Sequence, residues 1–265
     1  MSVLQVQRHG ATAVLTLNRP EQRNALDLEL REAFAEVVPQ VRDDPSVRAV
    51  VLAGAGNHFC SGGDIKTMAQ HLEGPRDIFE GRERIRKIHR WFDELVDLEK
   101  PVIAAVDGSV FGAGLSLALA ADYVIASPRA KFCSVFARIG YVPDMGLMYL
   151  LPRAVGLARA KELVFSARVF DAAEAQVLGI VQQLSSGEVL QDALRLAARF
   201  EHAPTEALGL AKSVMNRAFE SDRDTVYAQE AAAQAMCRES GFHQEALRRF
   251  LAKEAPTYQW PENKP

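Results

Sequence analysis

The sequence has few cysteines, and their spacing links them to no known framework. Cys60, Cys133 and Cys237 are the only three in 265 residues, and none belongs to a C-x-x-C pair. An odd number without such spacing argues against both a disulfide scaffold and a zinc site. The six histidines include no pair four residues apart, which is the spacing that places two ligands on one helix face. The sequence therefore predicts no metal centre.

The sequence also lacks a strong charge of either sign and any long apolar run. A net charge of -3 and a pI near 6.1 give no basic field of the kind that nucleic-acid-binding proteins use to neutralise phosphates. The first ten residues, MSVLQVQRHG, do not have the layout of a signal peptide, and no apolar run reaches the roughly 18 residues that a membrane helix needs. We therefore expect a soluble cytoplasmic protein that binds neither nucleic acid nor membrane.

Hydrophobic residues make up 48% of the chain, which is enough to bury the core of one α/β domain. Residues 3–7 and 13–17 alternate apolar and polar side chains on either side of a His-Gly turn, which predicts a hairpin. Segments 47–53, 102–106 and 123–126 are almost entirely apolar, as strands covered on both faces should be. Loops and helices separate these segments, so we expect parallel strands with ligands bound beyond their carboxyl ends.

Helical patterns fill the intervals and the last third of the chain. Asp27 is expected to cap a helix that Pro39 kinks or ends early. A second helix near 78–95 has an apolar stripe and a basic face, interpreted as solvated, and the small residues of 112–121 suggest a helix packed closely on the sheet. Four helical stretches follow, near 188–200, 205–219, 223–239 and 243–252. We expect a catalytic core over 1–190 and a C-terminal helical region over 191–265.

Two short glycine-bearing segments follow apolar runs and stand out as candidates for chemistry. They are Phe-Cys-Ser-Gly-Gly-Asp at 59–64 and Phe-Gly-Ala-Gly at 111–114. Each can aim bare backbone N–H groups at one point, and together they would form an oxyanion hole. Tight turns and close helix-strand packing are the alternative explanation for such glycines.

Several motifs in order resemble the enoyl-CoA hydratase/isomerase (crotonase) superfamily. They are Asn-Arg-Pro at 18–20, Arg-Asn-Ala-Leu at 23–26, the glycine segments 59–65 and 111–114, Lys-Pro-Val-Ile-Ala-Ala-Val at 100–106 and Leu-Pro-Arg at 151–153. The resemblance implies a crotonase-like α/β spiral of ββα units and a homotrimer, or a dimer of trimers, assembled through the C-terminal helices. It also implies an acyl-CoA thioester substrate and no cofactor beyond the coenzyme A of that substrate.

The same resemblance assigns the catalytic groups. The backbone N–H groups of Gly63 and Ala113 would be the oxyanion donors. Ser116 and Phe136 stand where the hydratases of the family have two glutamates, and neither side chain can act as a base at neutral pH. The segment 136–153 is instead similar to that of epoxyphenylacetyl-CoA and enoyl-CoA isomerases, which have an acid at the position of Asp144.

Asp144 is therefore the leading candidate for the catalytic base. Its apolar neighbours in the sequence should leave it poorly solvated, which raises the pKa of a carboxyl group and strengthens its conjugate base. The alternative is that Asp144 simply caps the helix that follows Pro143.

The resemblance also suggests residues that hold the substrate. For coenzyme A and the acyl group these are Arg23, Ala25, Gly63, Asp64, Ile65, Lys66, Ala113, Phe136, Phe250 and Lys253. Each of the cations is otherwise a solvated surface residue. Cys133, Ser134 and Tyr141 are further candidates to line the acyl pocket, with packing alone as the alternative.

Three functions remain open at this point. The favoured one is an isomerase that moves a double bond, or rearranges an activated ring, through an enolate. The second is an enoyl-CoA hydratase or related hydrolase in which Asp144 positions water. The third is an acyl-CoA-binding subunit without catalysis of its own.

Overall fold

The structure is a computed structural model that describes residues 2–70 and 77–260. Its main sheet has six strands in the order β1-β2-β3-β4-β6-β9. The first two strands form an antiparallel hairpin and all later neighbours are parallel, which confirms the predicted hairpin and parallel strands. The bounds are Leu4–His9 for β1, Thr12–Leu17 for β2, Ala49–Gly54 for β3, Val102–Val106 for β4, Tyr123–Ala126 for β6 and Gln183–Leu184 for β9.

A second sheet of three very short strands was not predicted from the sequence. Strand β7 (Lys131–Cys133) lies between β5 (Ser109–Phe111), to which it is parallel, and β8 (Phe170–Asp171), to which it is antiparallel. This small sheet begins two residues after β4 leaves the main sheet, so it lies beyond the carboxyl ends of the main strands. It frames the edge at which the sequence predicted ligand binding.

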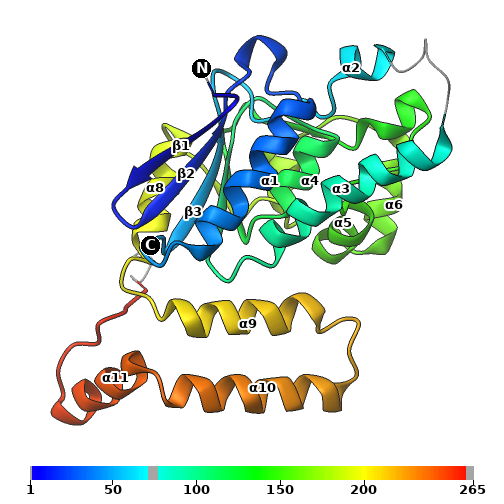
Figure 1. The fold of residues 1–265 in the computed structure, drawn as a ribbon. Coiled ribbons are helices and arrows are strands. Elements are labelled where there is room, and N and C mark those ends of the chain that lie inside the picture. Colours follow the sequence, from blue (N-terminus) through cyan, green and yellow to red (C-terminus); the bar gives the residue numbers. More distant parts are fainter. Residues whose placement is uncertain (1, 71–76, 261–265) are drawn as a thin grey trace.

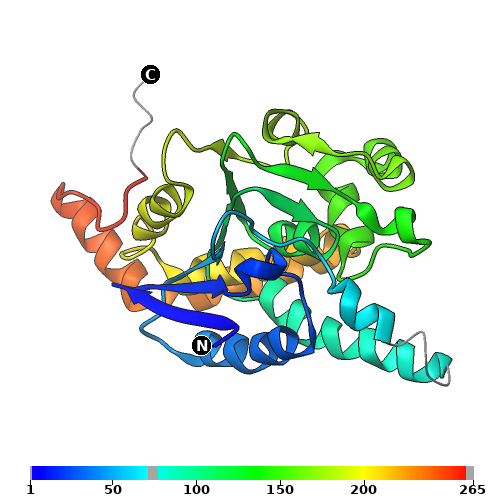
Figure 2. The ribbon, with the colours of Figure 1, turned by 90° about the horizontal axis from the view of Figure 1, so that it is seen from above.

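Helices cover both faces of the main sheet (Figures 1 and 2). On one face α1 packs against α3, and the rings of Phe34 and Trp91 stack with their centroids 4.8 Å apart. On the other face α8 lies against β3 and β4. Residues of one strand therefore face two different apolar layers, which explains their continuous hydrophobic runs. The bounds are Leu28–Asp43 for α1, Ile65–Gln70 for α2, Ile78–Val96 for α3, Ala113–Leu119 for α4, Leu147–Val155 for α5, Leu157–Ser166 for α6, Ala172–Val177 for α7 and Val189–Ala198 for α8.

The capping prediction for α1 is confirmed, because the Asp27 side chain accepts a hydrogen bond from the N–H of Leu30 at 2.9 Å. Of the two effects expected of Pro39, a kink or an early end, the early end is wrong, since α1 continues to Asp43. A proline leaves the carbonyl four residues earlier without its helical partner. That carbonyl belongs to Ala35, an exposed residue, so water can solvate it.

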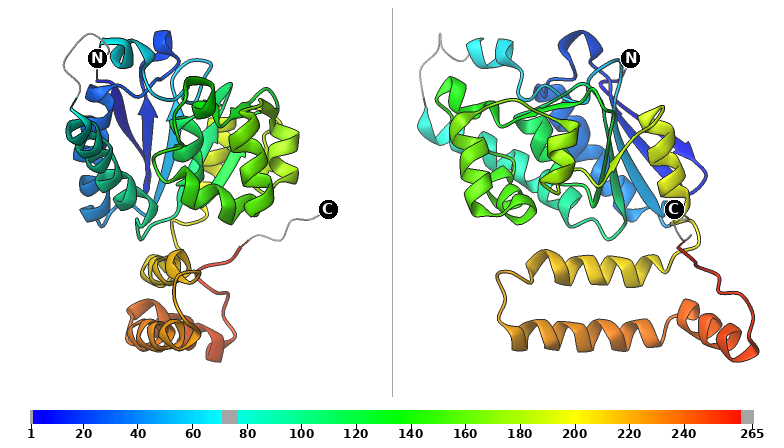
Figure 3. Two further views of the ribbon diagram at one scale, coloured as in Figure 1. Left: turned by 90° about the vertical axis from the view of Figure 1, so that its right-hand side faces the viewer. Right: turned by 180° about the vertical axis from the view of Figure 1, so that it is seen from behind.

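The last three helices project from the body as a separate layer (Figures 1 and 3). They are α9 (Thr205–Arg217), α10 (Arg223–Arg238) and α11 (Gly241–Ala252), close to the predicted stretches. Helix α9 touches the body through Lys212, whose buried ammonium lies 2.9 Å from a carboxylate oxygen of Asp122. Helices α10 and α11 bury no residue within the single chain. The predicted division at 190 falls inside α8, which packs on the sheet.

No helix in the part of the chain that the structure describes combines the length and the hydropathy needed to cross a bilayer.

Candidate active site

The two glycine-bearing segments lie side by side. The N–H of Phe111 donates to the carbonyl of Cys60 at 3.0 Å, as in a short parallel pair. A Cβ placed on Gly114 would lie only 2.3 Å from that same carbonyl oxygen, and one on Gly62 would lie 3.6 Å from the nitrogen of Ala113. Gly62 also has a φ of 101°, a region that other residues rarely adopt. Close approach therefore requires glycine at both positions.

Two backbone N–H groups at this junction have no acceptor in the part of the chain that the structure describes. Neither Gly63 nor Ala113 donates a backbone hydrogen bond to any group within residues 2–70 and 77–260. Ala113 is the first residue of α4, where helical N–H groups have no partner inside the helix. Both donors are thus free for an acceptor supplied from outside the chain.

Asp144 lies in the loop between the 3₁₀ helix Val135–Ile139 and α5, and it lines a cavity of about 810 Å³. The apolar part of the lining comes from α3 and from this loop and the start of α5: Ile85, Tyr141, Val142, Pro143, Met148 and Tyr149. Burial raises the pKa of the Asp144 carboxyl above its ordinary value, and it outweighs the opposite effect of Arg31, His89 and Arg84. The predicted poor solvation of Asp144 is confirmed.

The Asp144 loop is fixed from two sides. The hydroxyl of Ser116, on α4, donates to the backbone carbonyl of Asp144 at 3.2 Å. Met145 and Gly146 have φ values of 47° and 70°, and a Cβ on Gly146 would lie 2.8 Å from the ring of Phe92. A left-handed backbone is strained for methionine, so the surrounding contacts hold this turn in place.

The alternative role of Asp144 as a helix cap is not what the structure shows. The N-cap residue of α5 is Gly146, and no side chain accepts a hydrogen bond there. It is the backbone carbonyl of Asp144 that accepts from the N–H of Leu147, at 3.1 Å. The carboxylate is left to face the cavity.

Helix α4 connects the two halves of the site, because Ala113 begins it and Ser116 lies one turn later. Phe136, at the other position that resembles a hydratase glutamate, is buried beside the N-cap of α4. Its ring would lie 3.7 Å from a Cβ on Gly112. One of these two positions therefore holds the hydroxyl of Ser116, which already donates to a carbonyl. The other holds the phenyl ring of Phe136.

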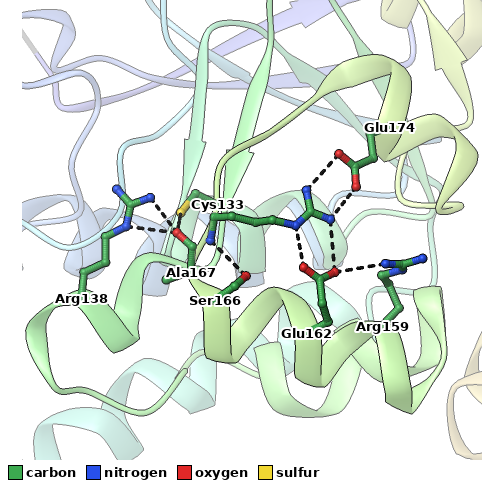
Figure 4. Close-up of polar contacts among 8 residues, drawn as sticks. Cys133, Arg138, Arg159, Glu162, Ser166, Ala167 and Glu174 are labelled. Atoms are coloured by element: carbon green, nitrogen blue, oxygen red, sulfur yellow. Dashed lines mark hydrogen bonds and ion pairs between the residues drawn. The ribbon is translucent and has the colours of Figure 1, made fainter.

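The segment before the Asp144 loop is anchored by an arginine (Figure 4). Arg138 donates from Nε and Nη2 to the carbonyl of Ala167, at 3.0 and 2.7 Å, and the buried thiol of Cys133 donates to the same oxygen at 3.1 Å. Cys133 therefore has a packing role. Of the three residues suggested for the acyl pocket, only Tyr141 lines the cavity, and the hydroxyl of Ser134 is buried without a partner among the described residues.

Among the residues suggested for coenzyme A, Asp64 already has protein partners. Its carboxylate lies 3.0 Å from a guanidinium nitrogen of Arg19 and accepts from the N–H groups of Lys66 and Thr67 at the start of α2. Burial opposes ionisation, yet these hydrogen bonds together lower the pKa of Asp64. The side chain thus shapes the loop and lines the cavity.

The other suggested residues fall into two groups. Arg23 is exposed, and Ala25 beside it is buried with its carbonyl bonded to Arg19. Ile65, which is 70% exposed, and Lys66 lie next to the cavity at the start of α2. Phe250 and Lys253 are at the end of α11, across the molecule from α2 (Figures 1 and 3). A single chain does not bring these two groups together.

Sequence reasoning missed the polar residues that helices α1 and α3 place in the cavity. They are Arg31, Arg84, His89 and Asp93. The basic face of α3 was predicted to be solvated, whereas Arg84 is half-buried and its Nε atom is buried. A detectable signal existed, because Arg84 precedes the buried Ile88 and Trp91 by four and seven residues and so shares their face.

The chain is similar to proteins of one family along nearly its whole length. The family model described as Enoyl-CoA hydratase/isomerase matches residues 7–261. A 1,2-epoxyphenylacetyl-CoA isomerase from Escherichia coli is 37% identical over 249 residues, covering 92% of this chain and 93% of the relative. A short-chain-enoyl-CoA hydratase from Clostridium acetobutylicum is 33% identical over 250 residues, covering 94% of each. The crystal structure of an enoyl-CoA hydratase/isomerase from Cupriavidus metallidurans CH34 matches with a TM-score of 0.92 and 38% identity, over 100% of this chain and 99% of that one.

Proposed function

The chain belongs to the enoyl-CoA hydratase/isomerase family, and we propose that it is an isomerase that shifts a double bond in an acyl-CoA through an enolate. The family acts on acyl-CoA thioesters, and the predicted crotonase-like fold is confirmed by the structural match. The observation that carries the proposal is a half-buried Asp144 with a raised pKa, whose backbone is bonded to Ser116 on α4. Ser116 and Phe136 stand at the two positions that resemble the glutamates of hydratases.

In the proposed mechanism, the thioester oxygen accepts hydrogen bonds from the N–H groups of Gly63 and Ala113. Asp144 removes the proton from the carbon next to the thioester of a β,γ-enoyl group. The electron pair of that C–H bond enters the conjugated system, and negative charge develops on the oxygen. One preorganised donor at such an oxygen is worth about 3 kcal/mol of barrier.

The same carboxylic acid then returns the proton to the γ-carbon, which places the double bond between the α- and β-carbons. No atom is gained or lost, and Asp144 is ionised again at the end. A single residue suffices because both carbons lie on one face of a delocalised anion. The proposal requires no cofactor beyond the coenzyme A portion of the substrate.

A hydratase is the second candidate, favoured by the short-chain-enoyl-CoA hydratase that is 33% identical. In this case Asp144 would position a water molecule, and His89 or Asp93 in the same cavity would take part in its activation. The reaction would then need two titratable groups rather than one. Variants at Asp144 and Asp93 separate the two candidates.

We test the proposal with a β,γ-enoyl-CoA and product analysis by mass. An isomerase gives an α,β-enoyl-CoA of unchanged mass in H₂O and incorporates solvent deuterium in D₂O. Asp144→Asn should abolish both, with folding and coenzyme A binding retained. Asp93→Asn, which also removes a carboxylate from the cavity, should keep isomerisation.

Other outcomes count against the proposal. With an α,β-enoyl-CoA as a second substrate, a product heavier by one water, without any turnover of the β,γ-enoyl-CoA, would identify a hydratase. Binding of both substrates without deuterium exchange or hydration would identify an acyl-CoA-binding subunit. Full isomerisation by Asp144→Asn would reject Asp144 as the base.

We further propose that the protein assembles as a homotrimer or a dimer of trimers through its C-terminal helices. Helices α10 and α11 bury nothing in one chain, and large apolar side chains are exposed on α9–α11 and the turn after α9: Met215, Phe219, Tyr227, Met236, Leu247, Phe250 and Leu251. Such a cluster is typical of an interface. Assembly would also give Phe250 and Lys253 access to the coenzyme A of a neighbouring copy. Sedimentation equilibrium, with Phe250→Glu as the disrupting variant, measures this directly.

A further inference from the structure

Two arginines in the Asp144 cavity have no carboxylate partner among the described residues. Arg31 projects from the first turn of α1 and Arg84 from α3, and both line the cavity. Within residues 2–70 and 77–260, neither guanidinium has a carboxylate oxygen within 4.0 Å, and the Nε atom of each is buried without a hydrogen-bond partner. Arg31 makes one hydrogen bond, from Nη2 to the carbonyl of Leu26 at 3.0 Å.

This arrangement is unfavourable for the two side chains, which are half-buried. A cation taken partly out of water carries a desolvation cost that a partner normally offsets. Burial lowers the pKa of Arg31, and the neighbouring charge of Arg84 lowers it further, despite the opposing effects of Asp144, Asp27 and Asp64. The cavity has three carboxylates, Asp64, Asp93 and Asp144. Asp64 is paired with Arg19, and neither Asp93 nor Asp144 lies within 4.0 Å of either guanidinium. Among the described residues, both guanidiniums are therefore left without an ion-pair partner.

We propose that Arg31 and Arg84 bind a carboxylate at the far end of the acyl chain, so that the substrate is an ω-carboxyacyl-CoA. The inference rests on the proposed function, because it places this acyl chain in the cavity that Asp144 lines. A guanidinium matches a carboxylate with two parallel hydrogen bonds, and two unfilled Nε donors are available here. Apolar residues such as Ile85 and Met148 would contact the methylene groups between the two ends.

The space fits such a ligand. A cavity of about 810 Å³ lies in the range typical of small-molecule sites. The base and the two cations line one continuous cavity, so that one extended acyl chain can reach all three.

The test compares matched thioesters. Δ3-enoyl-CoA substrates of about five to eight acyl carbons, in the size range of such cavities, are prepared in pairs that end in a methyl or a carboxylate group. For at least one length, the wild-type protein should show kcat/KM at least about 10-fold higher for the carboxylate member, as a charge-assisted hydrogen bond allows. Arg84→Gln should lower the ratio of kcat/KM for the carboxylate substrate to kcat/KM for the methyl substrate by about 10- to 100-fold. The charge of Arg84 also acts on Asp144, but that effect reaches both members of a pair and cancels in the ratio.

Arg86→Gln is the matched control, because Arg86 is exposed on the same helix and pairs with Glu83. It should leave kcat/KM unchanged for both substrates.

Pantetheine thioesters of the same acids separate acyl recognition from binding of coenzyme A phosphates. If the acyl carboxylate is the ligand, Arg84→Gln should lose the preference for the carboxylate with the pantetheine thioesters as well. A loss that affects both end groups equally and disappears with pantetheine thioesters would assign the arginines to phosphate and overturn the inference.

The two proposals fail in different ways. Isomerisation with no preference for the carboxylate at any length overturns the inference and leaves the isomerase intact. Calorimetric binding that prefers the carboxylate and depends on Arg84, without any turnover, supports the inference and rejects the isomerase.

Discussion

The hydrogen bond from Ser116 to the backbone of Asp144 should control how well the base is placed. Ser116 is fully buried, and its hydroxyl donates to the Asp144 carbonyl at 3.2 Å. Ser116→Ala removes this donor and leaves the carbonyl with the N–H of Leu147 at 3.1 Å as its partner. Because one partner remains, we expect the free energy of unfolding to fall by about 1 kcal/mol, the typical net value of one hydrogen bond.

This loss matters because the loop beyond Asp144 is strained. Met145, at a φ of 47° and almost fully buried, holds a left-handed conformation that costs about 1–3 kcal/mol. Removing a hydrogen bond whose free energy is similar to this strain energy lets the loop relax, so that Asp144 spends less time in its reactive position. We therefore expect kcat for the isomerisation to fall about 5-fold, the factor that 1 kcal/mol represents, with little change in KM.

The assay is steady-state turnover of a β,γ-enoyl-CoA together with thermal unfolding. Ser134→Ala is the matched control, because Ser134 is also buried and its hydroxyl has no partner in the described chain. This control should keep kcat and be neutral or stabilising. If Ser116→Ala and Ser134→Ala give the same kcat and the same stability, the hydroxyl of Ser116 does not hold the loop and the reasoning is refuted.

Three further predictions concern stability. Asp144→Asn should raise the free energy of unfolding at neutral pH, because burial raises the pKa of Asp144 in the folded protein. The gain should vanish below about pH 4, where the carboxyl is protonated in both the folded and the unfolded state. Unfolding measured as a function of pH checks this. Gly114→Ala should lower the free energy of unfolding by about 1–3 kcal/mol through overpacking and reduce turnover, since its Cβ would lie 2.3 Å from the Cys60 carbonyl oxygen. The control is Gly187→Ala, whose Cβ meets no atom within 4 Å and which should unfold like wild type in denaturant. Lys212→Ala should cost about 1–3 kcal/mol, because it leaves a partly buried carboxylate without its cation, and limited proteolysis should then cut the α9–α10 region sooner.

The parts of the fold that the sequence predicted well are those with a local signal. Strands β4 and β6 were placed to the residue, because each is a short apolar run between polar or turn residues. The small second sheet was missed, because its strands are only two or three residues long and exist through pairing with distant segments. Residue patterns carry little information about such pairings.

The candidate site divides in the same way. Asp144 and the two glycine segments could be predicted because each lies in a short motif that resembles the family. Arg31 and Arg84 were missed, because a cation on an amphipathic helix normally faces solvent and the face that Arg84 shares with Ile88 and Trp91 was not interpreted as a sign of burial. Their position depends on how α1 packs against α3, and their missing partners become visible only when both helices are in place.

One short helix links the requirements of packing and of chemistry. The small residues of α4 were interpreted as a sign of close packing, and Gly114 does pack against the Cys60 carbonyl. The same close approach places the N–H of Ala113 beside the Gly62–Gly63 turn, while Ser116 on the next turn holds the backbone of Asp144. The proposed anion site and the proposed base therefore cannot move independently. For this reason a single methyl group at Gly114 should disturb both, and the packing explanation of the glycines and the catalytic one describe the same contact.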